Sequence, residues 1–130
     1  MIVIDASVVV TALADDGHDG TRVRARLQGE RLIAPALLDI EATSAWRRLA
    51  AAGNLDDRRA QLAIIDLRQL RVDRISHLPL LDRCWELRHS LSTYDAVYVA
   101  LAEIIGVSLL TGDAKLARAP GTRCRIELLQ

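Results

Sequence analysis

Short apolar runs and longer amphipathic segments alternate along the chain, which is the pattern of strands alternating with helices. Strands are predicted at residues 2–4, 32–33, around 75, 108–110 and 124–128. Helices are predicted around residues 8–13 and over residues 19–27, 35–52, 56–70, 79–91, 92–105 and 113–117. This order predicts an α/β fold with a short parallel central sheet flanked by helices on both faces.

The clearest helical pattern lies between Pro35 and Gly53. Pro35 stops the preceding strand and suits the first turn of a helix, while Gly53 suits its C-terminal cap. The apolar stripe of this helix consists of Leu37, Leu38, Ala42, Ala45 and Leu49. Glu41 lies on the same face, where an unpaired carboxylate is costly. Glu41 is therefore either a solvated or Arg-paired residue at the edge of the stripe, or a functional acid.

Two further acids follow predicted strands. Asp5 closes the first strand, and Asp113 comes directly after Thr111 and a glycine at the end of the fourth. In parallel α/β sheets, ligand sites form outside the carboxyl ends of the strands, so both acids are candidate site residues. Each could instead cap the helix that follows it, and the neighbouring hydroxyls of Ser7 and Thr111 could belong to turns or caps.

A fourth acid, Asp95, stands near the start of a predicted helix. The run from Ser92 to Asp95 matches a capping box, for which a purely structural role is the simpler interpretation. The helix dipole favours the ionised form of Asp95 in either role.

The composition fits one globular domain over residues 1–130, with 51% apolar and 26% charged residues. No run approaches the roughly 20 apolar residues of a membrane helix, and Asp5 interrupts the first apolar run before any basic residue, unlike a signal peptide. We therefore expect a cytoplasmic protein without a membrane partner. A net charge of zero and 3% aromatic residues disfavour a basic field or a base-stacking module.

Several common site types have no motif in this chain. The two cysteines, Cys84 and Cys124, form no CxxC pair, so we expect both to be buried and unpaired rather than to bind zinc. Glycine-rich phosphate loops and the G-x-S-x-G elbow do not occur, which disfavours nucleotide-binding and serine-hydrolase functions.

Taken together, the acidic positions and their neighbours resemble a PIN domain. The residues that carry the resemblance are Val3-Ile4-Asp5-Ala6-Ser7, Glu41, Tyr94-Asp95-Ala96 and Leu110-Thr111-Gly112-Asp113. The match extends from residue 2 to about residue 128, and all four acidic positions follow the pattern of the family. Within this family the chain resembles VapC-type toxins of toxin–antitoxin pairs.

This resemblance implies a Mg²⁺- or Mn²⁺-dependent endoribonuclease. It implies that Asp5, Glu41, Asp95 and Asp113 are the acidic active-site positions, with Asp5 and Asp95 as direct metal ligands. Ser7 and Thr111 match auxiliary polar positions. It also implies a small antitoxin partner, a homodimer, and cleavage products with a 5′-phosphate and a 3′-hydroxyl.

Other functions remain open from the sequence. A phospho-acceptor receiver domain needs a lysine near a late strand end, whereas Lys115 lies past Asp113 in the predicted helix. A phosphatase of the DxD type needs an aspartate where Ser7 stands. A non-catalytic PIN-like module that binds RNA or protein is the main alternative, although such a module is expected to have lost at least one of the four acids.

Overall fold

The computed structural model describes residues 1–129. Its strands are β1 (Ile2–Ile4), β2 (Leu32–Pro35), β3 (Val72–Ile75), β4 (Leu109–Thr111) and β5 (Ile126–Leu128). Its helices are α1 (Ala6–Ala14), α2 (His18–Leu27), α3 (Leu38–Ala51), α4 (Asp57–Gln69), the 3-10 turn η1 (Leu78–Leu80), α5 (Leu81–Glu86), α6 (Thr93–Ile105) and α7 (Ala114–Ala117). These elements confirm the predicted alternation of strands and helices.

The five strands form one sheet in the order β3-β2-β1-β4-β5, and every neighbouring pair is parallel. The chain extends the sheet in one direction from β1 to β3 and then returns to add β4 and β5 on the other side of β1. The junction between β1 and β4 is therefore a topological switch point, where open α/β sheets place their ligand sites. Asp5 and Asp113 both come after the strands that meet there.

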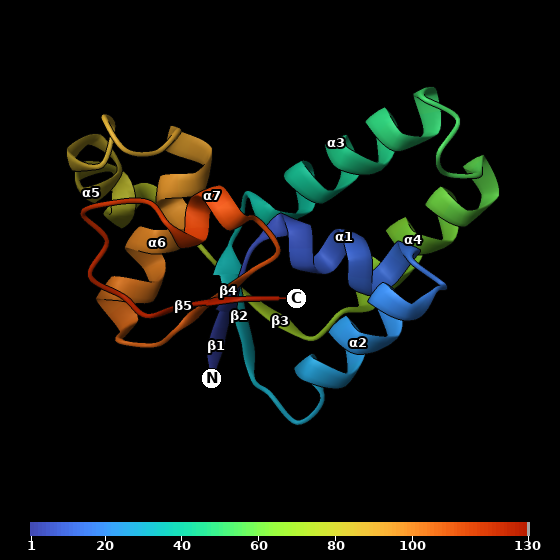
Figure 1. Ribbon diagram of the computed structural model, residues 1–130, viewed down its shortest axis with the longest axis horizontal. Helices are drawn as coiled ribbons and strands as arrows, with labels where there is room; N and C mark the ends of the chain where they lie inside the picture. The colour runs from blue at the N-terminus through green and yellow to red at the C-terminus, as the bar shows by residue number, and fades with distance from the viewer. Residues whose placement is uncertain (130) are drawn as a thin grey trace.

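Helices cover both faces of this sheet, which confirms the predicted fold class. Figure 1 shows α5 and α6 on one side of the strands and α1 to α4 on the other. Helix α6 contacts β1 and β2, and its residues 96–102 are all buried. An α-helix that is apolar all round belongs to the interior, so α6 lies between the sheet and α5 rather than on the surface.

Two proline-based predictions are wrong. Pro35 does not open a helix, because it is the last residue of β2 and pairs with Ile75, and α3 begins only at Leu38. Pro79 lies in the 3-10 turn η1, and the helix after it ends at Glu86 rather than near residue 91. Proline is tolerated both in the first turn of a helix and at the edge of a sheet, so the position of a proline in the sequence did not distinguish a helix start from a strand end.

The buried stripe of α3 is also shifted from the predicted one. Leu38, Ala42 and Trp46 are buried, whereas Leu37 and Ala45 are only partly covered. Because the centre of the stripe lies along Leu38 and Trp46, Glu41 falls at its edge and stays accessible from one side. The helix ends as predicted, with Gly53 at a φ of 78° just after the last turn.

Neither cysteine forms a disulfide, and their burial differs. Cys84 is buried as predicted, but Cys124 is partly exposed, which corrects the expectation for that residue. None of the helices within residues 1–129 has the length and apolar content that spanning a membrane requires.

An ion pair on α6 gives a pH-dependent contribution to stability. Glu103 accepts hydrogen bonds from Arg83 Nε at 2.7 Å and from the Arg123 backbone N–H at 2.6 Å, and its side chain is 11% exposed. Burial by itself raises the pKa of Glu103, but these hydrogen bonds and the Arg83 charge outweigh it and lower the pKa below its ordinary value of 4.5. The ionised form is therefore stabilised by folding.

We predict that Glu103→Gln lowers the free energy of unfolding by about 1.5–3 kcal/mol at pH 7, the range for a hydrogen bond to a charged group. A carboxyl group whose pKa is lowered by folding stabilises the fold at pH values above its unfolded pKa. This contribution is lost as the pH falls through the pKa of the folded protein. The difference between wild type and variant should therefore shrink below about pH 4.5. Denaturant unfolding at pH 7 and pH 3.5 measures it.

Glu86→Gln is the matched control, because Glu86 pairs with the same Arg83 but its side chain is 57% exposed. Exposed pairs contribute about 0–1 kcal/mol, so this variant should stay close to wild type. An equal loss for both variants, or a Glu103→Gln loss that does not change with pH, would contradict the assignment.

Candidate active site

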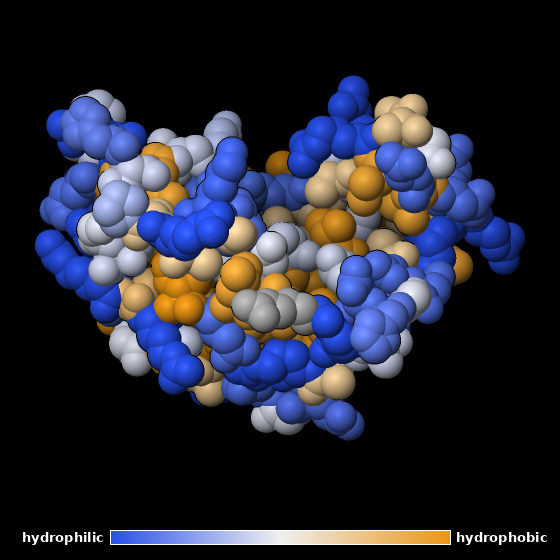
Figure 2. Space-filling model, in the orientation of Figure 1, coloured by the Kyte–Doolittle hydropathy of each residue, from blue (hydrophilic) through white to orange (hydrophobic). Residues whose placement is uncertain are grey.

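A cavity of about 340 Å³ lies at the carboxyl ends of β1 and β4. It is enclosed by the first turns of α1, the middle of α3 and the first turns of α6. Figure 2 shows the surface notched between the side that carries α5 to α7 and the side that carries α3. The four predicted acids all line this cavity: Asp5, Glu41, Asp95 and Asp113.

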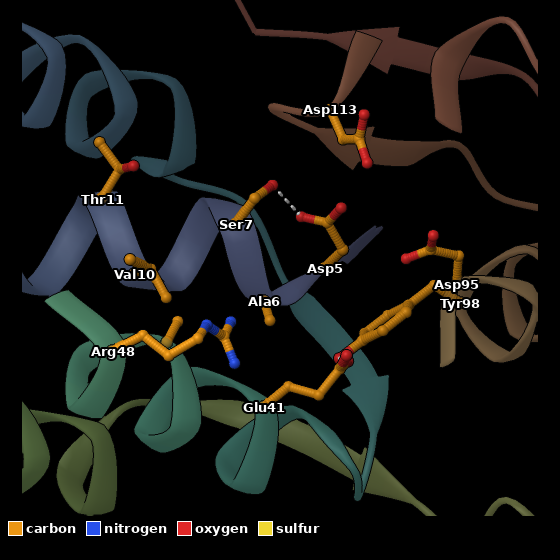
Figure 3. Close-up of a pocket in the computed structure, with 11 residues that line it drawn as sticks. Asp5, Ala6, Ser7, Val10, Thr11, Glu41, Arg48, Asp95, Tyr98 and Asp113 are labelled. Carbon is orange, nitrogen blue, oxygen red and sulfur yellow. Dashed lines mark hydrogen bonds between the residues drawn. The ribbon is translucent and has the colours of Figure 1, made fainter. Parts of the chain in front are cut away.

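Asp5 is the most enclosed of these acids, with 6% of its surface exposed. Its Oδ1 accepts a hydrogen bond from Ser7 Oγ at 2.5 Å and one from the Val8 backbone N–H at 3.3 Å, which caps α1. Its Oδ2 accepts from the hydroxyl of Thr111, a fully buried residue at the end of β4. Ser7 and Thr111 therefore hold the two oxygens of one carboxylate from two neighbouring elements. Figure 3 shows the bond from Ser7.

Capping and site roles thus coincide at Asp5. A carboxylate offers about four lone-pair directions, and three are used by these donors, so one remains for a ligand in the cavity. Burial raises the pKa of Asp5, the three hydrogen bonds oppose this, and the charge of Asp95 adds to the rise. The net result is a pKa above its ordinary value, so a positive charge in the cavity would favour the ionised form.

Asp95 and Asp113 reach the cavity from the N-terminal ends of two different helices, α6 and α7. Asp95 lies in the first turn of α6, where its backbone N–H donates to Ser92 Oγ at 3.2 Å. Burial raises the pKa of Asp95, and the charge of Asp113 raises it further. Asp113 caps α7 by accepting from the Lys115 backbone N–H at 2.8 Å. Both acids are therefore capping-region residues that also face the cavity.

Glu41 is held by a residue that the sequence analysis missed. The hydroxyl of Tyr98, on α6, donates to Glu41 Oε1 at 2.5 Å (Figure 3). Burial raises the pKa of Glu41, and the charges of Asp95 and Asp5 raise it further, against the Tyr98 bond. Tyr98 follows Asp95 by three residues on the same helix, and this spacing is the signal that could have identified it.

Arg48 is the second residue that the sequence analysis missed. It lies two helical turns after Glu41 on α3 and lines the cavity, and Figure 3 shows its guanidinium pointing inward. Its positive charge lowers the pKa of Glu41, the opposite of what the neighbouring acids do. The cavity therefore has one cationic wall facing four carboxylates.

The donor set fits a hard divalent cation. All of the acidic ligands are oxygens, and three of them have pKa values raised partly by one another's charge, so a cation would relieve their repulsion. Within residues 1–129, no three acidic, His or Cys side chains lie close enough together to hold a metal ion. The four acids line one cavity, so an ion there would contact few of them at once and would have to keep several waters, as Mg²⁺ does.

We predict that Tyr98→Phe lowers the turnover number of any reaction at this site by about tenfold or more. The ring stays in the core, but Glu41 loses a hydrogen bond of the charged kind, worth about 1.5–3 kcal/mol. Single-turnover kinetics on wild type and variant measures the change. Tyr94→Phe is the control, because Tyr94 is exposed and its hydroxyl has no such acceptor among the described residues. Unchanged turnover in Tyr98→Phe would contradict a positioning role for Tyr98.

The protein is an α/β domain with a parallel sheet and one acidic cavity, lined by the acids that follow β1 and β4 and by acids on α3 and α6. The sequence profile of the PIN domain matches residues 2–121. The chain is 42% identical over 129 residues to Ribonuclease VapC1 of Mycobacterium tuberculosis, covering 98% of this chain and 97% of that protein. The chain therefore belongs to the PIN-domain family, among the VapC-type proteins.

Solved structures share this fold. VapC20 of Mycobacterium tuberculosis, described as a sarcin-ricin loop cleaving toxin, matches 95% of this chain and 97% of its own at a TM-score of 0.69 and 17% identity. The VapBC2 structure from Rickettsia felis, bound to a DNA fragment from its promoter, matches 100% of both chains at a TM-score of 0.71 and 14% identity.

Proposed function

We propose that this chain is a Mg²⁺- or Mn²⁺-dependent endoribonuclease that acts as the toxin of a toxin–antitoxin pair. The observation that carries the proposal is the convergence of Asp5, Glu41, Asp95 and Asp113 on one cavity at the switch point of the sheet. A relative of 42% identity is named a ribonuclease, which supports RNA as the substrate.

The residues that would hold the metal are Asp5 and Asp95 directly, with Glu41 and Asp113 completing the acidic wall. An ion held there would supply a water of lowered pKa as the nucleophile and positive charge to offset the charge on the departing oxygen. Ser7 and Thr111 keep the Asp5 carboxylate in one orientation, and Tyr98 does the same for Glu41. Fixed donors of this kind add to catalysis because they need no reorganisation during the reaction.

The test is cleavage of a hairpin RNA by the purified, partner-free chain in the presence of Mn²⁺. We expect internal cuts whose products carry a 5′-phosphate and a 3′-hydroxyl, identified by end-labelling and phosphatase treatment. Binding of the hairpin without cleavage at any Mg²⁺ or Mn²⁺ concentration would favour a non-catalytic RNA-binding module instead.

The same proposal includes two protein partners. Structures of VapBC pairs from Rickettsia felis and Salmonella typhimurium share this fold, which supports a small antitoxin whose basic side chains approach the acidic cavity. Large apolar side chains on η1 and α5 are exposed, and these support a homodimer: Leu78, Leu81 and Trp85. Copurification with the small protein encoded beside this chain tests the first partner, and light scattering tests the second. A strict monomer at high concentration would remove the dimer from the proposal.

A further inference from the structure

A second hollow, also about 340 Å³, adjoins the acidic cavity. The two hollows share the side chains of Glu41 and Arg48, so α3 forms the boundary between them. The remaining walls of the second hollow come from Leu37, Ile40, Ser44 and Tyr94. The first hollow is bordered by four carboxylates and the second by only one, so they differ in the chemistry they can accept.

Arg48 gives the shared boundary a positive charge that is available to an anion. Within residues 1–129, its guanidinium forms no ion pair at 4.0 Å or less, and its Nη1 donates to Ser44 Oγ at 3.0 Å. By contrast, Arg74 and Arg59 each donate two hydrogen bonds to an aspartate. A guanidinium with free donors at the mouth of a cavity is well suited to a phosphate oxygen pair.

Tyr94 gives the second hollow an aromatic wall. Its side chain is 63% exposed, and Ile40 across the same hollow is 70% exposed. A ring at this exposure contributes little to the core, since its neighbours on α6 from residue 96 onward already fill the interior. Exposed tyrosine rings beside a cationic group are the usual platform on which nucleic-acid bases stack.

An RNA strand with its scissile phosphate among four carboxylates must pass its next phosphate through a neighbouring region. Carboxylates repel that second phosphate, and the only cation that lines the acidic cavity among the described residues is Arg48. Arg48 also lines the second hollow, together with Tyr94. The charge of Arg48 and the adjoining hollow beside Tyr94 therefore favour a path of the RNA strand from the acidic cavity into the second hollow.

We propose that the second hollow binds the RNA nucleotide next to the scissile phosphate, with Arg48 holding its phosphate and Tyr94 stacking on its base. This inference rests on the proposed function. Arg48 is thereby a substrate-binding residue, and the hollow selects single-stranded or extruded nucleotides, because a paired base cannot reach the ring.

The test uses a hairpin RNA whose loop carries the fluorescent base 2-aminopurine, with binding followed by stopped-flow anisotropy before cleavage and cleavage followed afterwards, both in Mn²⁺. Arg48→Gln should weaken binding about tenfold, raise KM more than it lowers kcat, and reduce the slope of log K against log salt by about 0.7. Tyr94→Ala should weaken binding by about fivefold to a hundredfold and remove the quenching of 2-aminopurine, whereas Tyr94→Phe keeps both.

Arg47→Gln is the matched control, because Arg47 is an exposed neighbour on the same helix and lines neither hollow. Equal losses in Arg47→Gln and Arg48→Gln would mean nonspecific charge and would overturn the inference. A Tyr94→Ala protein that binds RNA normally but changes its mass in light scattering would assign this face to a protein interface instead. Wild type that binds RNA without cleaving it would remove the proposed ribonuclease activity and leave these binding tests valid.

Discussion

Asp5→Asn is expected to lower RNA cleavage by at least about a hundredfold, the scale of losing one preorganised electrostatic group. The carboxylate has one lone-pair direction left for the cavity, and the amide removes its negative charge. The same variant keeps the helix cap, because asparagine caps helices about as well as aspartate, but its amide NH2 takes the place of one of the two oxygens that accept from Ser7 and Thr111. A matched measurement of cleavage in Mn²⁺ and of denaturant unfolding without metal therefore separates activity from stability.

The pKa of Asp5 also bears on how Asp5→Asn changes the free energy of unfolding without metal. The pKa of Asp5 is raised in the folded protein, chiefly by burial, so its ionised form opposes folding at neutral pH when no metal is present. Removing that charge takes away this unfavourable contribution and works against the loss of one hydrogen-bond acceptor, so the free energy of unfolding should stay close to that of wild type. Full activity in Asp5→Asn would exclude Asp5 from the catalytic site.

Asp66→Asn is the control for the amide substitution. Asp66 is exposed on α4 and does not line the acidic cavity, so both cleavage and unfolding should match wild type. If Asp5→Asn loses activity together with much of its stability, the lost activity reflects the fold. Asp95→Asn is then the deciding variant, because the side chain of Asp95 is less buried. A catalytic role for the acids requires that Asp95→Asn lose activity while remaining stable.

Removing the divalent metal is expected to have an effect of similar size. A metal that activates water and offsets charge contributes several kcal/mol, so EDTA should lower cleavage by at least about a hundredfold. Millimolar Mn²⁺ should restore it, because few protein ligands replace the waters of the ion and binding is weak without RNA. Initial cleavage rates at graded Mn²⁺ concentrations measure the response.

A thermal-shift titration supplies the matched physical readout. Mn²⁺ should raise the melting temperature of wild type, since it binds the folded carboxylates and relieves their repulsion. The shift should be smaller in Asp5→Asn and unchanged in Asp66→Asn. Undiminished cleavage in EDTA, or an equal shift in all three proteins, would contradict metal binding at this cavity.

The order of strands and helices, and the acids at the ends of these elements, could be predicted from the sequence because both depend on residues close together in the chain. Asp5 and Asp113 follow apolar strands, and parallel strands bring such positions to one edge of the sheet. Glu41 was detectable because a carboxylate stood out on an apolar helix face. Helix caps and active-site acids both occur at strand ends and helix starts, so the sequence pattern alone did not distinguish the two roles. At Asp5 the same carboxylate has both roles.

What the sequence did not reveal depends on contacts between distant segments. The bond from Tyr98 to Glu41 joins α6 to α3, and the approach of Arg48 depends on how α3 lies against α1. Trp46 shares a helix face with Leu38 and Ala42, and the neighbouring elements against which α3 packs decide that this face, rather than the one through Leu37 and Ala45, lies innermost. These features follow from helix placement, which residue spacing within one helix does not determine.

We propose that the four carboxylates hold the metal ion with which this chain cleaves RNA. Anomalous diffraction from crystals equilibrated with Mn²⁺, at a concentration that supports cleavage in solution, tests it most directly. We expect a Mn²⁺ peak in the cavity between Asp5 and Asp95 of wild type, and a much weaker peak in Asp5→Asn. A strong Mn²⁺ peak elsewhere on the chain, with none between these acids, would contradict it.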